Sequence, residues 1–496
     1  MTSLPTSLYR ADQVRALDRF AIEQQNIPGS VLMERAGKEA TDILKQNWPA
    51  AGNICVVCGS GNNAGDGYVL ARLCLESGLD ARVFYVTDPA SLKGDAQSAF
   101  EKFRAKSDAG PEKFSAGLIS NADVIVDALL GTGIDREVTG EYRAAIEAIN
   151  SAEKPVMAID IPSGLNADTG NVLGIAVRSD ITVTFIGLKQ GMFTGQGREY
   201  CGRICFSDLE VPSQIYRQQQ VDVSRIDYDN QSHLLTRREQ HSHKGNYGHA
   251  LIIGGDYGFA GAARMAAEAA ARSGAGLVSL ATRVEHAAGI PLAVPEIMAR
   301  GIHKTSDLNP LLDKASVIAI GPGLGQSDWS SSLLARVLET RLPMVLDADA
   351  LNLIARESAY SENWVLTPHV GEAARLLQGS TAEIMADRFH ALRSLREKYG
   401  GVIILKGSGT LVAGPGHSIS LCSDGNPGMA SGGMGDVLTG IVAGLVAQGI
   451  DMETAAKLAV CIHAAAADNA AKQGERGLLA TDLMPWVRRL VNYPNP

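Results

Sequence analysis

Short apolar runs, each ended by glycine or a polar turn, recur along the chain with helix-like segments between most of them. In the first half these runs lie at residues 53–61 (NICVVCGSG), 81–88, 123–133, 155–164, 180–187 and 203–209. Strands that are almost continuously apolar are buried on both faces, and helical crossovers between them make them parallel. The pattern predicts an α/β fold with a parallel sheet between layers of helices. Two amphipathic segments, residues 7–25 and 30–46, are predicted to be helices that precede the first strand.

The same pattern restarts in the second half, at residues 249–256 (HALIIGGD), 276–282, 316–325, 343–354, 364–369 and 401–410. Between the halves, apolar periodicity fades over residues 212–232, where polar residues dominate as they do in linkers. A chain of 496 residues is also too long for one compact domain. Because the halves share no fixed repeat, we expect two distinct α/β domains, residues 1–225 and 226–496.

Composition and charge argue against several classes of partner. The net charge of −9 argues against nucleic acid, since neutralising phosphates requires concentrated Lys and Arg. No uninterrupted apolar stretch reaches the roughly 18 residues of a membrane span, and the N-terminus lacks the regions of a secretory signal. We therefore expect a cytoplasmic protein without nucleic-acid or membrane partners.

Two local patterns invite a metal site but are better explained otherwise. Cys55 and Cys58 form a CxxC pattern inside a strand, where alternation points them to opposite faces, so buried packing is expected. His241 and His243 have no further ligands at zinc spacing, and we reject a zinc site there.

Polar or glycine-rich loops follow three predicted strands of the first half. They contain residues 59–67 (GSGNNAGDG), Asp127 with residues 131–137 (GTGIDRE), and Asp160 with Ser163. Ligands of open α/β sheets bind at the carboxyl ends of strands. Clustered carboxylate, amide and hydroxyl oxygens suit a hard cation there, and glycine amides suit a pyrophosphate. The alternative is that Asn and Asp only cap helices and shape turns.

The motifs NNAGDGYVLAR (62–72), VDALLGTG (126–133) and DIPSGLNADTG (160–170) resemble the N-terminal domain of NAD(P)H-hydrate epimerases. The resemblance spans roughly residues 10–215. It implies a Rossmann-like fold that binds hydrated NADH or NADPH beside a potassium ion (K⁺), with Asn63, Asp127 and Ser163 as the potassium ligands. The implied substrate contacts are Asn62, Asn63, Ala64, Gly65, Asp66, Gly131, Thr132, Gly133, Ile134, Asp135, Arg136, Glu137 and Asp160.

One position departs from that family, which commonly reads NNGGDG where this chain has Ala64. A methyl group is tolerable there only if Ala64 has a negative φ. Epimerisation must break and remake a bond at the carbon that bears both the hydroxyl and the ring nitrogen, through an iminium-like or ring-opened species. A carboxylate beside the ring would stabilise positive charge and move a proton, and Asp160 is the candidate catalytic residue.

In the second half, SGGMGDVLTG (431–440) places glycines and Asp436 before an apolar segment. A helix N-terminus with free amides stabilises charge on a transferring phosphoryl group, while Asp436 would accept the proton of an attacking hydroxyl. KGSGT (406–410) adds a cation and small residues suited to nucleotide phosphates, although it lacks Walker A spacing. By itself, SGGMGD resembles the anion hole of ribokinase-like kinases.

Together with TPHVGE (367–372) and GLLATDLMP (477–485), these motifs resemble the ADP-dependent NAD(P)H-hydrate dehydratases over roughly residues 235–490. The resemblance implies a ribokinase-like α/β fold, with ADP as co-substrate and magnesium (Mg²⁺) on its phosphates. The implied contacts to the hydrated dinucleotide are Ala260, Gly323, His369 and Asp436. The implied contacts to the nucleotide are Lys406, Gly407, Ser408, Gly409, Thr410 and Gly435.

The sequence thus predicts a bifunctional repair enzyme for hydrated NADH and NADPH. One domain would interconvert the R and S forms, and the other would dehydrate the S form through a phosphorylated intermediate, with Asp436 as the base. One alternative is a ribokinase-like kinase of a small alcohol with a fused nucleotide-binding regulatory domain. Another is a first domain that only senses nucleotides or binds proteins. A homo-oligomer is expected, with small molecules as the other partners.

Overall fold

The structure is a computed structural model that describes residues 4–357, 359–416 and 418–492. The chain forms two compact units, residues 1–223 and 224–496, and the division falls inside the polar segment 212–232. Short elements occupy that segment, including β10 (Val223–Ile226) and α7 (Tyr228–Gln231).

Unit 1 contains a parallel sheet in the order β4-β3-β2-β5-β6-β7-β9. Its strands are β2 (Asn53–Cys58), β3 (Asp80–Tyr85), β4 (Glu112–Lys113), β5 (Val124–Ala128), β6 (Val156–Ile159), β7 (Ile181–Phe185) and β9 (Arg203–Ser207). From β2 the chain proceeds to β3 and β4 on one side and then to β5 on the other. Open α/β sheets bind ligands at such a reversal of strand order, outside the carboxyl ends of the strands.

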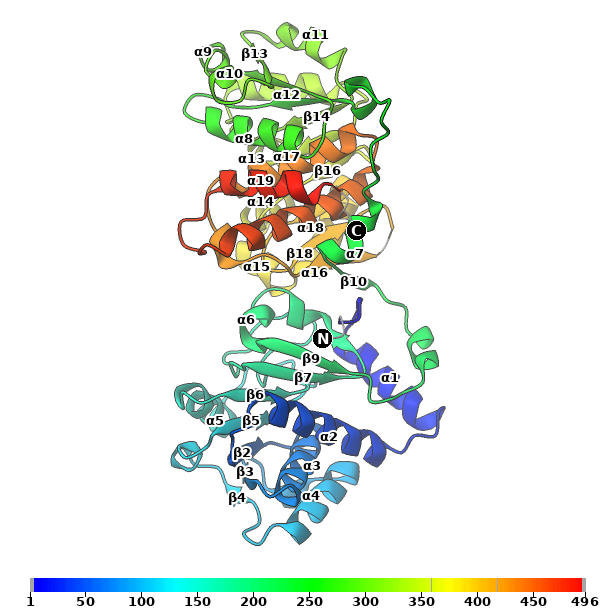
Figure 1. Cartoon of the computed structure of the whole chain (residues 1–496), viewed down its shortest axis with the longest axis vertical. Coiled ribbons are helices and arrows are strands. Elements are labelled where there is room, and N and C mark those ends of the chain that lie inside the picture. The colour runs from blue at the N-terminus through cyan, green and yellow to red at the C-terminus, as the bar shows by residue number, and fades with distance from the viewer. Residues whose placement is uncertain (1–3, 358, 417, 493–496) are drawn as a thin grey trace. The chain divides into compact units, whose positions relative to one another are not determined.

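Helices cover both faces of this sheet. They are α1 (Ala11–Glu23), α2 (Gly29–Asn47), α3 (Asn62–Glu76), α4 (Gly94–Lys106), α5 (Gly140–Ser151) and the short α6 (Gly197–Cys201). Residues of α1 to α4 share one core cluster with Val56 and Cys58 of β2, whereas α5 shares a second cluster with Cys55 and Val57. Figure 1 shows α2, α3 and α4 side by side on one face. The predicted three-layer fold is confirmed, and Cys55 and Cys58 lie on opposite faces as predicted.

The first predicted helix is wrong at its start. Ser7–Tyr9 form strand β1, which pairs in parallel with β8 (Leu188–Lys189). Arg10 has an extended backbone and its N–H donates to the Gln13 side chain at 2.9 Å, so α1 begins only at Ala11. A tertiary pairing thus overrides the local helical periodicity.

Unit 2 contains the strand order β13-β12-β11-β14-β15-β16-β17-β18-β19, parallel up to β17 and antiparallel through β18 and β19. The strands are β11 (His249–Ile253), β12 (Leu277–Thr282), β13 (Met298–Gly301), β14 (Val317–Ile320), β15 (Met344–Leu346), β16 (Trp364–Leu366), β17 (Val402–Leu405), β18 (Thr410–Ala413) and β19 (Ile419–Cys422). The order reverses at β11, between β12 and β14.

Helices of unit 2 lie on both faces of its sheet. They are α8 (Ala260–Arg272), α9 (Val284–Ala287), α10 (Ile290–Ala293), α11 (Asn309–Leu312), α12 (Asp328–Leu338), α13 (Ala348–Ile354), α14 (Val370–Leu377), α15 (Thr381–Ala386), α16 (Arg388–Tyr399), α17 (Met434–Ala447), α18 (Met452–Ala471) and α19 (Met484–Leu490). Residues of α8, α17, α18 and α19 share a core cluster with Ala250 and Ile252. The alternate residues Leu251 and Ile253 are buried as well, so both faces are covered.

Small residues let α17 and α8 approach closely, because a Cβ on Gly440 would fall 2.2 Å from the Ala266 carbonyl oxygen. This packing fixes the N-terminus of α17, and with it Asp436, above the sheet. Among the described residues, no helix combines the length and the apolar character that crossing a membrane requires.

Candidate active sites

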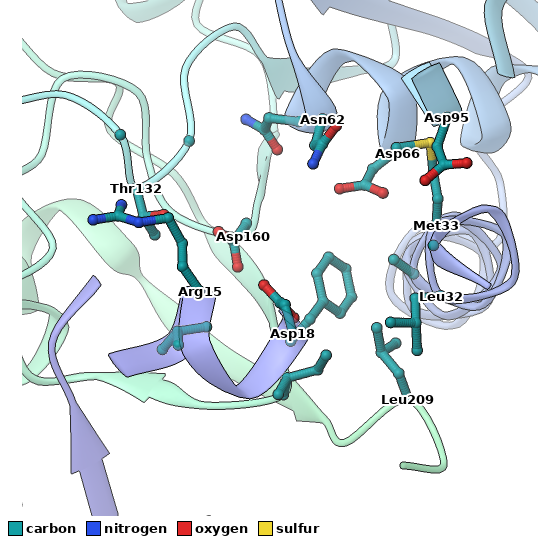
Figure 2. A pocket seen from close by; sticks show the side chains of 18 of the residues that line it. Arg15, Asp18, Leu32, Met33, Asn62, Asp66, Asp95, Thr132, Asp160 and Leu209 are labelled. Atoms are coloured by element: carbon teal, nitrogen blue, oxygen red, sulfur yellow. The ribbon is translucent and has the colours of Figure 1, made fainter. Parts of the chain in front are cut away.

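A cavity of about 470 Å³ opens at the carboxyl ends of the unit 1 strands. Figure 2 shows polar side chains entering it from α1, α3 and the strand-end loops, with Leu32, Met33 and Leu209 forming an apolar part of the wall. A mixed lining of this kind can hold a ring system and still place a few polar groups on it.

The structure brings many of the predicted substrate contacts to this cavity. Those that line it are Asn62, Asn63, Asp66, Gly131, Thr132, Gly133, Ile134 and Asp160. Ala64, Gly65, Asp135, Arg136 and Glu137 are not part of the lining.

Ala64 and Gly65 have packing roles in α3. Ala64 is fully buried and is not among the residues with positive φ, so the methyl group that departs from NNGGDG is accommodated. A Cβ on Gly65 would lie 2.6 Å from the Met33 sulfur, so a side chain at this position would require Met33 of α2 to move.

Asp160 follows β6 and has a φ of +67°, a left-handed conformation that Asp tolerates better than most residues. Its carboxylate is paired with the ammonium of Lys189, whose side chain is fully buried. Lys189 also donates to the Thr184 hydroxyl at 2.8 Å and to the Phe185 carbonyl at 3.4 Å. Asp160 is therefore held as one partner of an ion pair at the edge of the cavity.

Two further carboxyl groups, Asp18 of α1 and Asp66 of α3, share the cavity with Asp160. Burial raises the pKa of Asp18 to about 6, with the Lys189 charge opposing and the Asp160 charge adding to the rise. Burial likewise raises the pKa of Asp66 well above its ordinary value, and Asp160 and Asp18 add to it. One buried ammonium thus faces three carboxyl groups, and they cannot all ionise freely.

Two of the predicted potassium ligands, Asp127 and Ser163, contact each other directly, and the third, Asn63, lies against the loop that Ser163 also contacts. Asp127 is fully buried and accepts hydrogen bonds from the Ser163 hydroxyl at 2.6 Å and the Ser163 N–H at 2.8 Å. Burial raises its pKa to about 6, although these bonds oppose the rise. The Ser163 hydroxyl also contacts the backbone of Leu130. A Cβ on the next residue, Gly131, would lie 3.5 Å from the Asn63 Cβ.

The Asn63 side chain carries the clearest sign of a missing partner. Its amide oxygen and nitrogen are buried and make no hydrogen bond to any described residue. A buried amide without a partner is costly, and an oxygen-binding cation would satisfy the carbonyl end. The residues present therefore fit a potassium ion.

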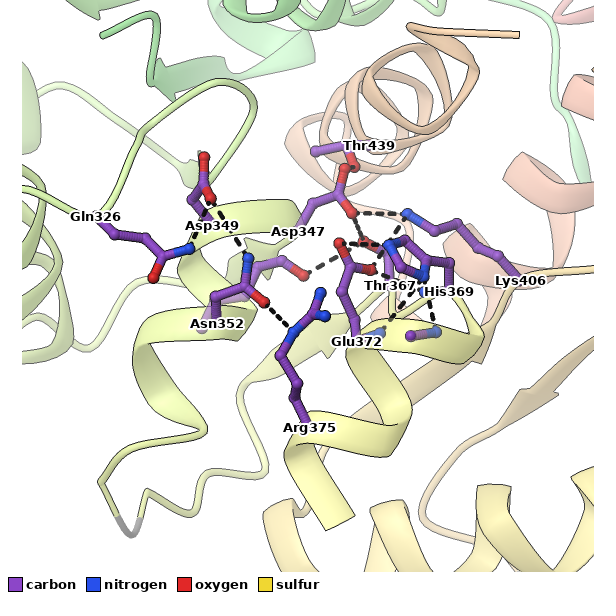
Figure 3. A network of polar contacts seen from close by, with 12 residues as sticks. Gln326, Asp347, Asp349, Asn352, Thr367, His369, Glu372, Arg375, Lys406 and Thr439 are labelled. Carbon is purple, nitrogen blue, oxygen red and sulfur yellow. Dashed lines mark hydrogen bonds and ion pairs between the residues drawn. The ribbon is translucent and has the colours of Figure 1, made fainter. Parts of the chain in front are cut away.

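In unit 2, a buried carboxylate, Asp347, organises the polar network at the carboxyl ends of the strands (Figure 3). It accepts hydrogen bonds from the Thr367 hydroxyl at 2.7 Å, the Thr439 hydroxyl at 2.8 Å and the Lys406 ammonium at 2.8 Å. Burial alone would raise the pKa of Asp347, but the Lys406 charge and these hydrogen bonds outweigh burial and hold the pKa below its ordinary value. The network thereby ties β15, β16, β17 and α17 together.

Asp436 lies in the first turn of α17 and borders this network. Burial raises its pKa to about 7, and the Asp347 and Glu372 carboxyls add to the rise while Lys406 opposes it. A carboxylate with that pKa is a stronger base than an ordinary Asp and is matched to neutral pH. A Cβ on the preceding Gly435 would lie 3.1 Å from the Lys406 ammonium, so the first turn of α17 closely approaches that cation.

His369, predicted to contact the dinucleotide, is the N-cap residue of α14, a structural role that requires no ligand. Its ring Nδ1 accepts from the Gly371 N–H at 2.9 Å, and its own N–H donates to the Glu372 carboxylate at 2.8 Å. The ring is nevertheless half exposed, and its Nε2 lies 3.4 Å from Glu372. Burial and the Lys406 charge lower the pKa of His369, so its ring is neutral at pH 7. Capping and ligand contact are thus compatible at this residue.

The KGSGT loop is held in shape from below by Arg388, the first residue of α16. Its buried guanidinium donates to the carbonyls of Ser408 at 2.5 Å and Gly409 at 2.8 Å, and also to those of Leu405 and Lys406. Gly407 and Gly409 have φ values of +147° and +67°, which favour glycine. The Lys406 side chain turns to Asp347, while Thr410 begins β18.

Ala260 and Gly323 lie on neighbouring loops at the same sheet edge. Ala260 begins α8 after the β11 loop, and a Cβ on Gly323 would lie 2.7 Å from the Phe259 carbonyl oxygen. The Asp256 N–H donates to the Gly323 carbonyl at 2.7 Å, which fixes the two loops together. All predicted contacts of unit 2 thus come from loops at the carboxyl ends of its strands or from the start of α17.

Four residues of these sites are absent from the prediction: Asp18, Lys189, Asp347 and Arg388. The sequence does contain a sign of Asp18, because it lies at four-residue spacing between Val14 and Ile22 and so shares one face of the helix with them. All three residues line the cavity. Asp347 follows a predicted strand in DADALN, the position shared by Asp127 and Asp160. Lys189 and Arg388 had no such sign, because Asp160 and the carbonyls of the KGSGT loop lie many residues away from them in the sequence.

Comparisons with known proteins agree across the whole chain. Residues 29–191 match the family described as YjeF-related protein N-terminus, and residues 250–489 match the family described as NAD(P)H-hydrate dehydratase. The bifunctional NAD(P)H-hydrate repair enzyme Nnr of Coxiella burnetii is 49% identical, covering 98% of this chain and 100% of the relative. The enzyme of the same name from Escherichia coli is 43% identical over 99% of this chain and 95% of its own.

A solved structure supports the fold of unit 2. A ribokinase-like superfamily protein from Enterococcus faecalis V583 superposes with a TM-score of 0.51 at 31% identity, covering 55% of this chain and 96% of its own. The predicted ribokinase-like fold is thereby confirmed. With full-length relatives at this level of identity, the chain belongs to the family of bifunctional NAD(P)H-hydrate repair enzymes.

Proposed function

We propose that this chain repairs hydrated NADH and NADPH at two separate sites. Residues 1–225 would epimerise the R and S forms, and residues 226–496 would dehydrate the S form at the expense of ADP. The observation that carries the proposal is that one chain contains two carboxylate sites of different construction. One lies in a cavity beside a buried lysine, and the other lies at a helix N-terminus. Full-length similarity to bifunctional repair enzymes supports it.

In unit 1, the hydrated ring would occupy the cavity with its hydroxyl-bearing carbon near Asp160. The Asp160 carboxylate would stabilise positive charge that develops when the ring nitrogen donates its lone pair. The wall formed by Leu32, Met33 and Leu209 would hold the apolar part of the ring.

Potassium is the ion that we assign to Asn63, Asp127 and Ser163. Their oxygens suit a hard cation, and Asn63 has a buried carbonyl with no other partner. When bound, the ion would supply positive charge next to the loop 131–137 and so favour an anionic dinucleotide. Asp127 would remain ionised beside it, since a nearby cation lowers a carboxyl pKa.

In unit 2, Asp436 would remove the proton of the substrate hydroxyl as that oxygen attacks the terminal phosphorus of ADP. The bond from this phosphorus to its bridging oxygen breaks, and AMP leaves with the electron pair. The resulting phosphate ester is a better leaving group than hydroxide, so elimination restores the dihydronicotinamide and releases inorganic phosphate. The amides at the start of α17 would stabilise the phosphoryl charge in transit.

The nucleotide would lie along residues 406–410 and Gly435. The shape that Arg388 gives to this loop, and the closeness of Gly435 to the Lys406 ammonium, support that placement. Magnesium would accompany the ADP phosphates; the sequence assigns it no protein ligand. The described residues contain no group of three or more His, Cys, Asp or Glu side chains arranged to hold a metal ion.

The test is recovery of reduced cofactor from a mixture of both epimers with ADP, magnesium and potassium. Complete recovery, with one phosphate released per cofactor, is the expected result. If recovery stops when one epimer is consumed, unit 1 has no epimerase activity and that part of the proposal is wrong. A stable phosphorylated alcohol without a rise in dihydronicotinamide absorbance would instead indicate a kinase.

A further inference from the structure

The carboxyl group of Asp18 has no partner in the part of the chain that the structure describes: no hydrogen bond or ion pair to it is found there. Asp18 lies on the stripe of α1 formed by Val14, Asp18 and Ile22, and this stripe faces the unit 1 cavity. A partly buried carboxyl between two apolar neighbours is costly unless it interacts with something in the cavity. Figure 2 shows Asp18 and Asp160 converging there from different elements.

The two carboxyl groups differ in their neighbours. Asp160 is paired with Lys189, which is fully buried and fixed further by Thr184. Asp18 has no such partner. When two carboxyls share a site, one holds a proton in preference to the other, and a cation on one of them decides which. Because Lys189 pairs with Asp160 and makes no such contact with Asp18, Asp18 is the carboxyl group placed to carry the proton.

We infer that Asp18 is the proton-transfer residue of the epimerase, protonating the hydroxyl of the hydrated ring beside the Asp160 carboxylate that is paired with Lys189. This inference rests on the proposed function of unit 1. It changes the role predicted for Asp160, which becomes an electrostatic partner rather than the group that moves the proton.

The step balances without a further reactant. As the C–O bond breaks, its electron pair leaves with the oxygen, and the Asp18 proton converts that oxygen to water. The ring nitrogen lone pair forms the C=N bond of an iminium cation, which the Asp160 anion stabilises. Water then adds to the other face of the carbon, and its surplus proton returns to the Asp18–Asp160 pair.

Charged and titratable groups on several elements bear on the ionisation of Asp18. Asp160 and Lys189 act on it most directly, while Asp66 and Tyr216 interact with it electrostatically and Arg15 and Asp95 line the same cavity. Burial raises the Asp18 pKa to about 6. A general acid must be protonated, so the epimerisation rate should fall as pH rises above about 6 and level off below it.

The test compares Asp18→Asn, Asp18→Glu and Asp12→Asn in the full chain, measuring epimer interconversion above a buffer blank from pH 5 to 9. Asp12 lies on the same helix but is exposed and outside the cavity, so it serves as the matched control. Asp18→Asn should lower kcat about 10²- to 10⁴-fold and lose the inflection near pH 6. Asp18→Glu should regain activity, and Asp12→Asn should match the wild type.

Each contrary result has a separate meaning. If the wild-type chain interconverts no epimers, the proposed function of unit 1 fails and takes this inference with it. If the wild type is active and Asp18→Asn matches it, only the inference fails. A slow Asp18→Asn chain that keeps the inflection assigns the titration to another group and also overturns it. ADP-dependent dehydration of the S form, measured on each variant, shows that unit 2 is intact.

Discussion

At the scale of single residues, Asp436 combines a functional role with a cost in stability. Its pKa of about 7 in the folded chain lies far above the ordinary value of 3.8, mainly because of burial and the neighbouring Asp347. A base must be ionised to act, so dehydratase turnover should rise about tenfold per pH unit below 7 and level off above it. Asp436→Asn should lower turnover about 10²- to 10⁴-fold while nucleotide binding persists. Unchanged turnover would refute the assignment.

The same raised pKa predicts that the ionised Asp436, which catalysis needs, lowers the stability of the folded chain. A carboxyl whose folded pKa is raised binds its proton more tightly in the folded state, so ionising it destabilises the fold as pH rises above 4. Asp436→Asn should therefore raise the melting temperature at pH 8, with the gain disappearing near pH 4. Thermal unfolding followed at both pH values checks this, and a loss of stability at pH 8 would contradict it.

At the scale of elements, the first turn of α17 depends on having no side chain at Gly435. An added Cβ would lie 3.1 Å from the Lys406 ammonium, so that ammonium, which donates to Asp347, would have to shift by a few tenths of an ångström. The methyl group would also stand between the first turn of α17 and the proposed nucleotide phosphates, so Gly435→Ala should weaken nucleotide-dependent turnover about tenfold, which corresponds to about 1.4 kcal/mol. Gly432→Ala is the control, because its Cβ would meet no atom within 4 Å. Equal kinetics of the two variants would show that the approach of α17 to Lys406 is unimportant.

Elements also show what could be predicted from sequence. The continuous apolar strands and their polar ends identified both parallel sheets, and parallel strands bring Asp127 and Asp160 to one edge whatever the details of the loops. The β18–β19 hairpin was not predicted, since its strands are short and its pairing is antiparallel. Lys189 was also beyond reach, because its ammonium meets the Asp160 carboxylate across 29 residues of sequence, a contact that no local pattern records.

At the scale of the whole molecule, each unit has a complete set of chemical groups of its own. The carboxyls and the lysine of the epimerase site all belong to residues 1–223, and the Asp347 network and Asp436 all belong to residues 224–496. Nothing in either set requires a side chain from the other unit. If the epimer released by one site reaches the other through solution, the two activities need not reside on the same molecule.

Two variants of the full chain test this independence. Asp160→Asn should recover only the S form from a mixture of epimers, and Asp436→Asn should recover neither while still interconverting them. An equimolar mixture of the two variants should recover all of the cofactor, at a rate set by their concentrations, because each supplies the site that the other lacks. Absorbance of the dihydronicotinamide follows the reaction. If the mixture stalls where Asp160→Asn alone stalls, although Asp436→Asn still interconverts the epimers, the epimer must pass between sites within one molecule.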